Sequence, residues 1–167
     1  METAIKGPCR ILIISDSHGR LANLQQLMKK MKSPDLTIHC GDLEALPEDI
    51  ERIVGSKLVY VRGNCDFSPS LPLERELMID RYKVLVTHGN RYGVSGTPLI
   101  LQEEAKGRGY DMAFFGHTHR PYLNIGSDIT LANPGSISLP RQDNGRASYL
   151  IMEIDRAGEA HFHQNYL

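Results

Sequence analysis

The sequence predicts an α/β fold in which a largely parallel sheet is followed by a second region of mostly β-strands. In the first half of the chain, short apolar runs alternate with segments of helical periodicity, which is typical of β-α-β units. In the second half, apolar runs are separated by turns rich in Gly, Asn and Pro, which indicates β-structure. The chain has 167 residues, of which 41% are hydrophobic, so we expect one compact domain over residues 1–167.

Three strands and two helices are expected in the first half. Apolar residues recur at helical spacing from Leu21 to Met31 and stop before Pro34, which predicts a helix of about three turns. Pro47 begins a shorter helix, and Gly55 ends it as a C-cap. The strands around these helices are expected at 10–14, 36–39 and 57–61.

In the second half, residues 73–80 and 81–88 alternate with period two and predict a hairpin-like pair, which extends the fold through a second sheet or an antiparallel edge. Thr97 and Pro98 fit the N-cap and first residue of a helix that Gly107 ends. Further strands are expected at 112–115, 121–125, 129–132 and 148–154, before a final strand that carries His161 and His163.

Composition and charge exclude several classes of protein. The net charge is −1 and the basic residues are scattered, so neither nucleic acid nor an anionic membrane is an expected partner. Apolar runs such as Ile11–Ile14 are far shorter than the ~20 residues of a membrane-spanning helix. The first ten residues contain no apolar h-region of the kind a signal peptide has, so we expect neither feature. The three cysteines have no C-x-x-C spacing, which favours reduced thiols and a cytoplasmic location.

Polar residues of metal-ligand type follow five of the apolar runs. In α/β sheets, the loops after the carboxyl ends of strands converge on one crevice, so these side chains are expected to meet there. The candidates are Asp16, His18, Asp42, Asn64, His88, His117 and His119. Such a set suits Mn²⁺, Fe²⁺, Zn²⁺ or Ni²⁺. Two ions sharing Asp42 would each receive four protein ligands, and ions ~3.5–4 Å apart can clamp a phosphoryl group and hold an attacking hydroxide.

Five motifs resemble, in order and spacing, those of the calcineurin-like metallophosphoesterases. They are D-S-H at 16–18, G-D at 41–42, G-N-C-D at 63–66, H at 88 and G-H-T-H at 116–119. Together with T-H-G at 87–89 and N-P-G-S at 133–136, they are similar to the small bacterial and archaeal phosphodiesterase subfamily. The resemblance covers nearly the whole chain, and five motifs in the right order make it specific.

The resemblance implies a four-layer αββα sandwich, in which two mixed β-sheets are flanked by helices. It also implies a dinuclear centre, for which we expect Mn²⁺ first. One ion would be bound by Asp16, His18, Asp42 and His119, and the other by Asp42, Asn64, His88 and His117. The expected activity is hydrolysis of a small phosphodiester substrate by a hydroxide that bridges the two ions.

Cys65 departs from the pattern, because most of the wider family has histidine there. In the family that histidine contacts the phosphoryl oxygens or protonates the leaving group, and the acid that follows, here Asp66, orients it. A thiol with an unperturbed pKa near ~8.5 is a weak donor. Losing the histidine should slow hydrolysis of a monoester more than hydrolysis of a diester with an acidic leaving group. We therefore assign catalytic roles to Asp42, Asn64, Cys65 and Asp66; for Cys65 a small space-filling role is the alternative.

Simpler interpretations exist for single residues. Asp16, Asp42 or Asn64 alone could cap the following helix, and His39 lies outside every motif, which favours a structural role. His161 and His163 fit a solvated strand face. Alternative functions also stay open: a phosphomonoesterase or nucleotide pyrophosphatase on the same site, or a non-catalytic scaffold like the retromer subunit of this fold. Sequence does not fix the physiological substrate, the native metal or whether the chain forms a homo-oligomer.

Overall fold

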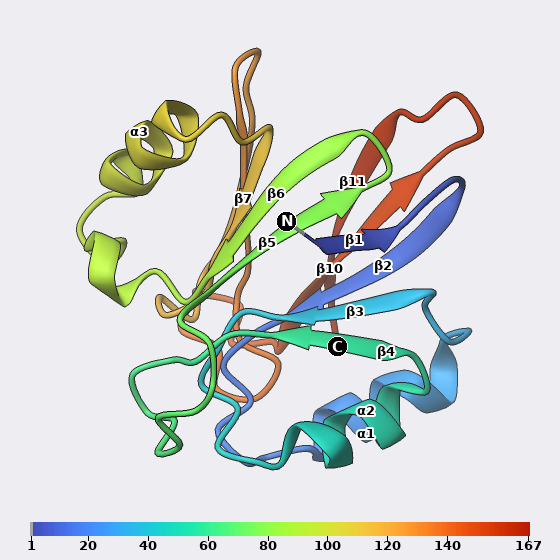
Figure 1. Cartoon of the computed structure of the whole chain (residues 1–167). Coiled ribbons are helices and arrows are strands. Elements are labelled where there is room, and N and C mark those ends of the chain that lie inside the picture. Colours follow the sequence, from blue (N-terminus) through green and yellow to red (C-terminus); the bar gives the residue numbers. More distant parts are fainter. Residues whose placement is uncertain (1) are drawn as a thin grey trace.

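The computed structural model describes residues 2–167 and contains two β-sheets that pack face to face (Figure 1). Helices α1 (Ala22–Lys30) and α2 (Pro47–Val54) cover the outer face of one sheet. Helix α3 (Leu99–Gly107) packs on the outer face of the other. This arrangement confirms the expected αββα sandwich.

The five-stranded sheet contains the parallel strands expected from the first half of the chain. Its order is β11-β10-β2-β3-β4. Strands β2, β3 and β4 run parallel, whereas β10 is antiparallel to both of its neighbours. The strand bounds are β2 (Cys9–Ile14), β3 (Leu36–His39), β4 (Lys57–Tyr60), β10 (Ser148–Ile154) and β11 (Ala160–Tyr166).

The six-stranded sheet has the order β1-β5-β6-β7-β9-β8. Its strands are β1 (Glu2–Ile5), β5 (Glu74–Ile79), β6 (Tyr82–Thr87), β7 (Met112–Phe114), β8 (Pro121–Ile125) and β9 (Thr130–Pro134). The expected hairpin is present as the antiparallel pair β5–β6 in this second sheet. Strand β1 was not expected; it pairs in parallel with β5 at the edge.

The predicted start of α3 was wrong by one residue. Pro98 is the N-cap and Leu99 the first helical residue, and the Thr97 hydroxyl accepts a hydrogen bond from the Leu99 N–H at 3.3 Å. The Thr97 hydroxyl thus makes the contact expected of it, since an N-cap side chain accepts from the N–H two or three residues later, and only the first helical residue differs. A short 3₁₀ helix, η1 (Asn90–Tyr92), was not expected either. At the end of α2, Gly55 adopts the left-handed C-cap conformation that the sequence predicted, with φ of 65°.

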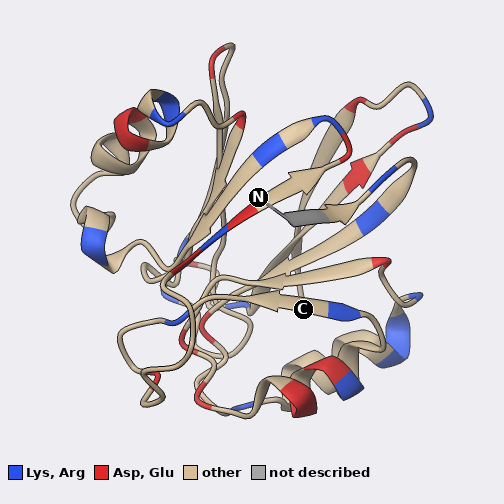
Figure 2. Cartoon of the chain, viewed as in Figure 1, with Lys and Arg blue, Asp and Glu red and all other residues tan. Residues whose placement is uncertain are grey.

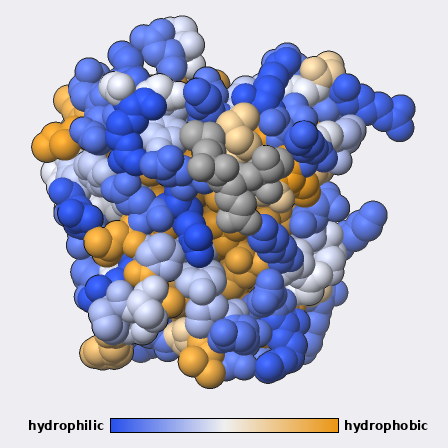
Figure 3. Space-filling model, viewed as in Figure 1, coloured by the Kyte–Doolittle hydropathy of each residue, from blue (hydrophilic) through white to orange (hydrophobic). Residues whose placement is uncertain are grey.

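Alternate residues of β2 are buried in different layers. Ile11 and Ile13 lie in the cluster between the two sheets, and Leu12 and Ile14 lie in the cluster beneath α1 and α2. A strand buried on both faces is a continuous apolar run in sequence, which explains the pattern of β2. Large exposed apolar side chains are scattered among hydrophilic ones, as the face in Figure 3 illustrates; Phe67, in the loop after β4, is 89% exposed.

The loops that follow β2, β3, β4, β6 and β7 meet at one edge of the two sheets. Within one sheet, Asp16 N donates to Gly41 O at 3.0 Å, and within the other, Gly116 N donates to His88 O at 3.1 Å. Between the sheets, His117 N donates to Asp16 Oδ2 at 3.1 Å. The packing of the sheets therefore determines where these loops meet.

His39 is fully buried in β3, where its Nε2 lies 2.9 Å from the Ser17 hydroxyl and its Nδ1 accepts from Gly41 N at 3.2 Å. Burial lowers the pKa of His39 to about 4. A neutral, hydrogen-bonded histidine of this kind fits the structural role expected for it. No helix within residues 2–167 is long and apolar enough to cross a membrane.

Candidate metal centre

The site loops adopt a strained backbone. Seven non-glycine residues within residues 2–167 have positive φ, and six of them belong to these loops. The six are Asp16 (54°), His18 (46°), Asp42 (55°), Glu44 (47°), His117 (69°) and His119 (57°). The left-handed region costs an L-residue roughly 1–2 kcal/mol, so surrounding contacts must hold the loops in place. Strain concentrated in this way is typical of functional sites.

Asp16 is held from several sides but keeps one oxygen unbonded. Its side chain is fully buried, and its backbone carbonyl accepts hydrogen bonds from Ser136 Oγ at 2.8 Å and Ser138 Oγ at 2.9 Å. Oδ2 accepts from His117 N, whereas buried Oδ1 has no hydrogen-bond partner among the described residues. A buried carboxylate oxygen without a partner is costly, so this atom calls for a cation.

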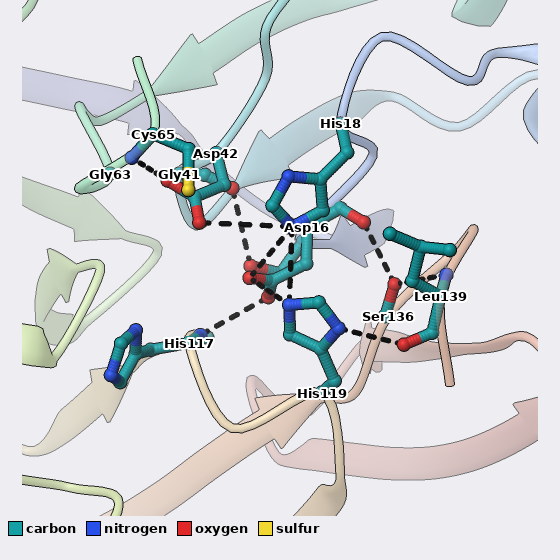
Figure 4. Close-up of polar contacts among 12 residues, drawn as sticks. Asp16, His18, Gly41, Asp42, Gly63, Cys65, His117, His119, Ser136 and Leu139 are labelled. Carbon is teal, nitrogen blue, oxygen red and sulfur yellow. Dashed lines mark hydrogen bonds and ion pairs between the residues drawn. The ribbon is translucent and has the colours of Figure 1, made fainter. Parts of the chain in front are cut away.

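His119 presents a second acceptor to the same place. Its Nδ1 lies 2.7 Å from the Leu139 carbonyl, which can only accept, so the hydrogen is on Nδ1 and Nε2 keeps its lone pair. That Nε2 lies 3.2 Å from Asp16 Oδ1 and 3.1 Å from His18 Nε2. Figure 4 shows the three side chains pointing toward one another. Their donor atoms form one of the groups within 4.8 Å that could bind an ion.

His88 repeats this arrangement beside Asp42. Its Nδ1 donates to the Cys40 carbonyl at 2.8 Å, which leaves Nε2 unprotonated in the neutral ring. Nε2 lies 3.0 Å from Asn64 Oδ1 and 3.3 Å from Asp42 Oδ2. All three atoms are acceptors, and Asp16, Asp42 and His88 form a second group of donor atoms within 4.8 Å.

The pKa values agree with a site that seeks positive charge. Burial alone would lower the pKa of His88, but the carboxylates of Asp42 and Asp16 raise it above its ordinary value. Burial alone would raise the pKa of Asp42, but hydrogen bonds from His88 and from Cys65 N hold it below its usual range. A proton on His88 Nε2 would partly replace the positive charge that a divalent ion provides.

His117 is not brought into these groups. Its ring packs edge-on against His88 with 5.1 Å between ring centroids, and Figure 4 shows it pointing away from Asp16. Burial and the neighbouring His88 lower the pKa of His117. Of the seven predicted ligands, six are therefore clustered, and His117 lies beside the second group.

The capping interpretation does not apply to Asp16 or Asp42. The N-caps of α1 and α2 are Leu21 and Leu46, and neither helix start has a side-chain cap. The two carboxylates instead face the imidazoles of the candidate centre.

A family model for the calcineurin-like phosphoesterase superfamily domain matches residues 9–157. The chain belongs to this superfamily. The probable metallophosphoesterase YsnB of Bacillus subtilis strain 168 is 37% identical over 146 residues, which cover 87% of this chain and 84% of YsnB. Phosphodiesterase YfcE of Escherichia coli strain K12 is 28% identical over 172 residues, with 87% of this chain and 88% of YfcE covered.

Among solved structures, a predicted phosphoesterase from Streptococcus pneumoniae TIGR4 has the same fold. The TM-score is 0.77 at 24% identity, with 98% of this chain and 100% of the other covered. Membership of the calcineurin-like phosphoesterase superfamily indicates phosphoester hydrolysis as the class of chemistry. The facing acceptors described above provide the setting that divalent ions need.

Cys65, the residue at which the sequence departs from the expected motif, lies next to Asp42, whose Oδ1 accepts a hydrogen bond from Cys65 N at 2.7 Å. Its Sγ forms a third possible donor group with His18 and Asp42, although no cysteine was expected among the ligands. Burial and the nearby Asp42 raise the pKa of the thiol to about 11. The side chain is therefore a neutral thiol, as the sequence suggested, and a weak hydrogen-bond donor.

Asp66 and Glu44 hold the site loops and the His18 ring in place through hydrogen bonds. Asp66 is buried, and its two oxygens accept hydrogen bonds from Glu44 N and Gly63 N, each at 2.8 Å. Asp66 thus joins the loops after β3 and β4. Glu44 was missed in the sequence: its carboxylate hydrogen-bonds His18 Nδ1 and orients that ring. The sequence feature that could have indicated Glu44 is its position two residues after Asp42 in the same loop.

Asn133 supports the loop of His117 and His119. Its side-chain amide donates to Gly116 O at 2.9 Å and Thr118 Oγ1 at 3.1 Å. The N-P-G-S segment therefore acts at the site through the loop and through the Ser136 contact with Asp16, as well as forming a turn.

Gly63 is required by a close approach. A Cβ added there would lie 2.1 Å from Asp42 Oδ1, far inside van der Waals contact. We predict that Gly63→Ala displaces the Asp42 carboxylate and weakens Mn²⁺ binding by at least about tenfold, as loss of a ligand's supporting contacts typically does. Titration calorimetry of Mn²⁺ into metal-free protein measures the affinity, and circular dichroism checks folding.

Gly107→Ala is the matched control, because a Cβ at this residue of α3 meets nothing within 4 Å. It should bind Mn²⁺ as the wild type does. Equal Mn²⁺ affinity for both variants and the wild type would contradict the close-approach argument.

Proposed function

We propose that this protein is a metal-dependent phosphodiesterase with a dinuclear centre that cleaves a small phosphodiester substrate. The observation that carries the proposal is the pair of facing acceptors, His119 Nε2 with Asp16 Oδ1 and His88 Nε2 with Asp42 Oδ2, at 3.2 and 3.3 Å. Neither pair has a hydrogen between its atoms when the rings are neutral, so the repulsion is relieved by a proton on Nε2 or by a metal ion that both acceptors bind. Mixed imidazole and carboxylate donors suit Mn²⁺, Fe²⁺, Zn²⁺ or Ni²⁺, and we take Mn²⁺ as the first candidate.

We propose one binding position beside each pair, with Asp42 as a ligand of both. Asp16, His18, Asp42 and His119 would hold the first ion, and Asp42, Asn64 and His88 the second. His117, which lies beside this second group, would complete it by turning its ring toward Asp42. His18 Nε2 lies 3.8 Å from Asp42 Oδ2, and His88 Nε2 lies 3.3 Å from the same oxygen. This oxygen between the two groups makes Asp42 the bridging ligand of the proposal.

When bound, two divalent ions supply the charge that draws the phosphoryl oxygens in and lowers the pKa of the attacking water. The chain's own residues provide the rest. Asp42 and Asn64 would bind the ions and so position the substrate. The Asp42 carboxylate is itself held in place, because Oδ1 accepts a hydrogen bond from Cys65 N at 2.7 Å. Asp66 holds the loop that carries Asn64 and Cys65. Cys65 offers a weak neutral donor to the substrate.

Unpaired arginines around the site favour an anionic substrate. Four arginines lie within three residues of a proposed ligand in the chain, and the backbone N–H of a fifth donates to the His119 carbonyl at 3.0 Å. None of the five forms an ion pair with any side chain that the structure describes. They are Arg20, Arg62, Arg91, Arg120 and Arg141. Figure 2 shows basic residues among the loops at this edge. Guanidinium groups bind phosphate oxygens well, so the site can attract a phosphoester although the net charge is −1.

A diester suits this site better than a monoester. A monoester dianion that expels an alkoxide depends most on proton donation to the leaving group. The neutral Cys65 thiol donates weakly, whereas a diester with an acidic leaving group needs little donation. The name of YfcE, a phosphodiesterase, supports the same choice. All three cysteines are free in the structure, and we propose that the single-domain enzyme acts in the reducing cytoplasm.

The first test is metal dependence. We predict that metal-free protein does not hydrolyse bis(p-nitrophenyl) phosphate and that Mn²⁺ restores hydrolysis. Asp42→Asn should lower kcat/KM by at least about a hundredfold, because the shared carboxylate charge is lost. Hydrolysis by protein freed of metal would contradict the proposal. Bound ions without hydrolysis, across several metals, would favour the non-catalytic scaffold.

The second test concerns Cys65. We predict that Cys65→His raises the ratio of monoester to diester kcat/KM by at least about tenfold, because imidazolium protonates an alkoxide leaving group. Methyl phosphate, which expels an alkoxide and whose hydrolysis is followed by phosphate release, is the monoester substrate, and bis(p-nitrophenyl) phosphate is the diester. Cys65→Ser is the control, since a neutral hydroxyl should leave the ratio near that of the wild type. An unchanged ratio in Cys65→His would refute the assigned role of this position.

A further inference from the structure

A pocket of about 280 Å³ adjoins the candidate centre on the α3 side of the six-stranded sheet. Its apolar wall includes Val94, Pro98, Phe115 and Tyr122. Val94 and Phe115 are buried in the cluster beneath α3, which makes the floor firm. Tyr122, on β8, is 37% exposed, and its ring lies tilted to that of Phe115 with 6.1 Å between centroids. The two rings contact each other, and Tyr122 is the one that exposes aromatic surface to the pocket.

The pocket is continuous with the loop that carries two proposed ligands. Thr118, between His117 and His119, contributes to its wall, and Phe115 comes just before the same loop. The loop is fixed, because the Asn133 amide donates to both Gly116 O and Thr118 Oγ1. A group attached to a phosphorus atom at the centre therefore has this pocket as a neighbour. The hollow of about 350 Å³ over β10 and β11 shares no residue with the site loops. A hollow of about 340 Å³ beside the loops after β3 and β4 includes Glu44 and Asp66, but Phe67 is the one aromatic residue in the wall that the structure describes.

One side of the pocket is polar. Ser95, Thr118 and Arg120 line it, and the Arg120 guanidinium has no ion-pair partner among the described side chains. The pocket thus combines aromatic and aliphatic walls with hydrogen-bonding groups and a free positive charge. A planar heteroaromatic ring fits such walls, since it can stack on aromatic surfaces while its ring nitrogens and oxygens reach polar groups.

We infer that this pocket binds a nucleobase carried by one ester group of the phosphodiester substrate, so that the substrate class is nucleotide diesters. The inference rests on the proposed function and specifies its substrate. The exposed face of Tyr122 contacts the ring above the floor that Val94 and Phe115 form, and Arg120 contacts the edge of the base or its phosphate. An alkyl ester group leaves the pocket unfilled and gains nothing from it.

The experiment compares p-nitrophenyl diesters that share one leaving group and differ in the other ester: methyl, phenyl and thymidine 5′. With Mn²⁺-loaded protein, we predict that kcat/KM for the thymidine ester exceeds that for the methyl ester by at least about fivefold, the effect of one aromatic contact. Tyr122→Ala should abolish this preference. An equal gain for the phenyl ester would overturn the nucleobase assignment and leave a general aromatic pocket.

Leu123→Ala is the matched control, because Leu123 is the next residue of β8, is also 37% exposed and lies outside the pocket. It should keep the wild-type preference for the thymidine ester. A preference that is absent from the wild type, or that survives in Tyr122→Ala, would refute the inference.

A binding measurement separates this inference from the proposed function. Calorimetry with Mn²⁺-loaded protein compares thymidine 5′-monophosphate with methyl phosphate. Tighter binding of the nucleotide by the wild type but not by Tyr122→Ala supports the pocket even if no diester is cleaved. Equal binding of both phosphates refutes it even if the methyl diester is cleaved.

Discussion

The candidate centre depends on lone pairs that face one another in a buried place. Backbone carbonyls of Leu139 and Cys40 take the Nδ1 hydrogens of His119 and His88, and this leaves both Nε2 atoms directed at carboxylate oxygens. Without a cation, such contacts are repulsive and the buried Asp16 Oδ1 lacks any partner among the described residues. The folded chain therefore stores an electrostatic cost that bound divalent ions would remove.

Packing of the two sheets holds the facing acceptors in place despite their repulsion. Strand β2, which leads into the loop of Asp16 and His18, is buried on both faces, so it cannot shift to relieve the site. Ser136 and Ser138 bind the Asp16 carbonyl, Asp66 joins the loops of Glu44 and Gly63, and Glu44 orients His18. Positive φ at six site residues is held by the same contacts. The packed core thus keeps the candidate ligands in one arrangement before any ion binds.

The fold and most of the candidate ligands were accessible from the sequence because they follow local patterns. The apolar run of β2 and the spacing of α1 are periodic, and the ligands follow strand ends in a known order of motifs. Strand β1 was missed because its pairing with β5 is determined by residues 77–79, far along the chain. Glu44 was missed for a similar reason: its value lies in the contact with His18, which only the fold creates. The orientation of His117 also depends on packing, here against His88.

The central claim is that two ions bind on either side of Asp42. Anomalous X-ray diffraction at the manganese edge, from crystals grown with Mn²⁺, tests it most directly. A dinuclear centre predicts two anomalous peaks ~3.5–4 Å apart, one beside Asp16 and His119, the other beside Asn64 and His88, with Asp42 between them. A single peak, or peaks away from these residues, would contradict the dinuclear assignment.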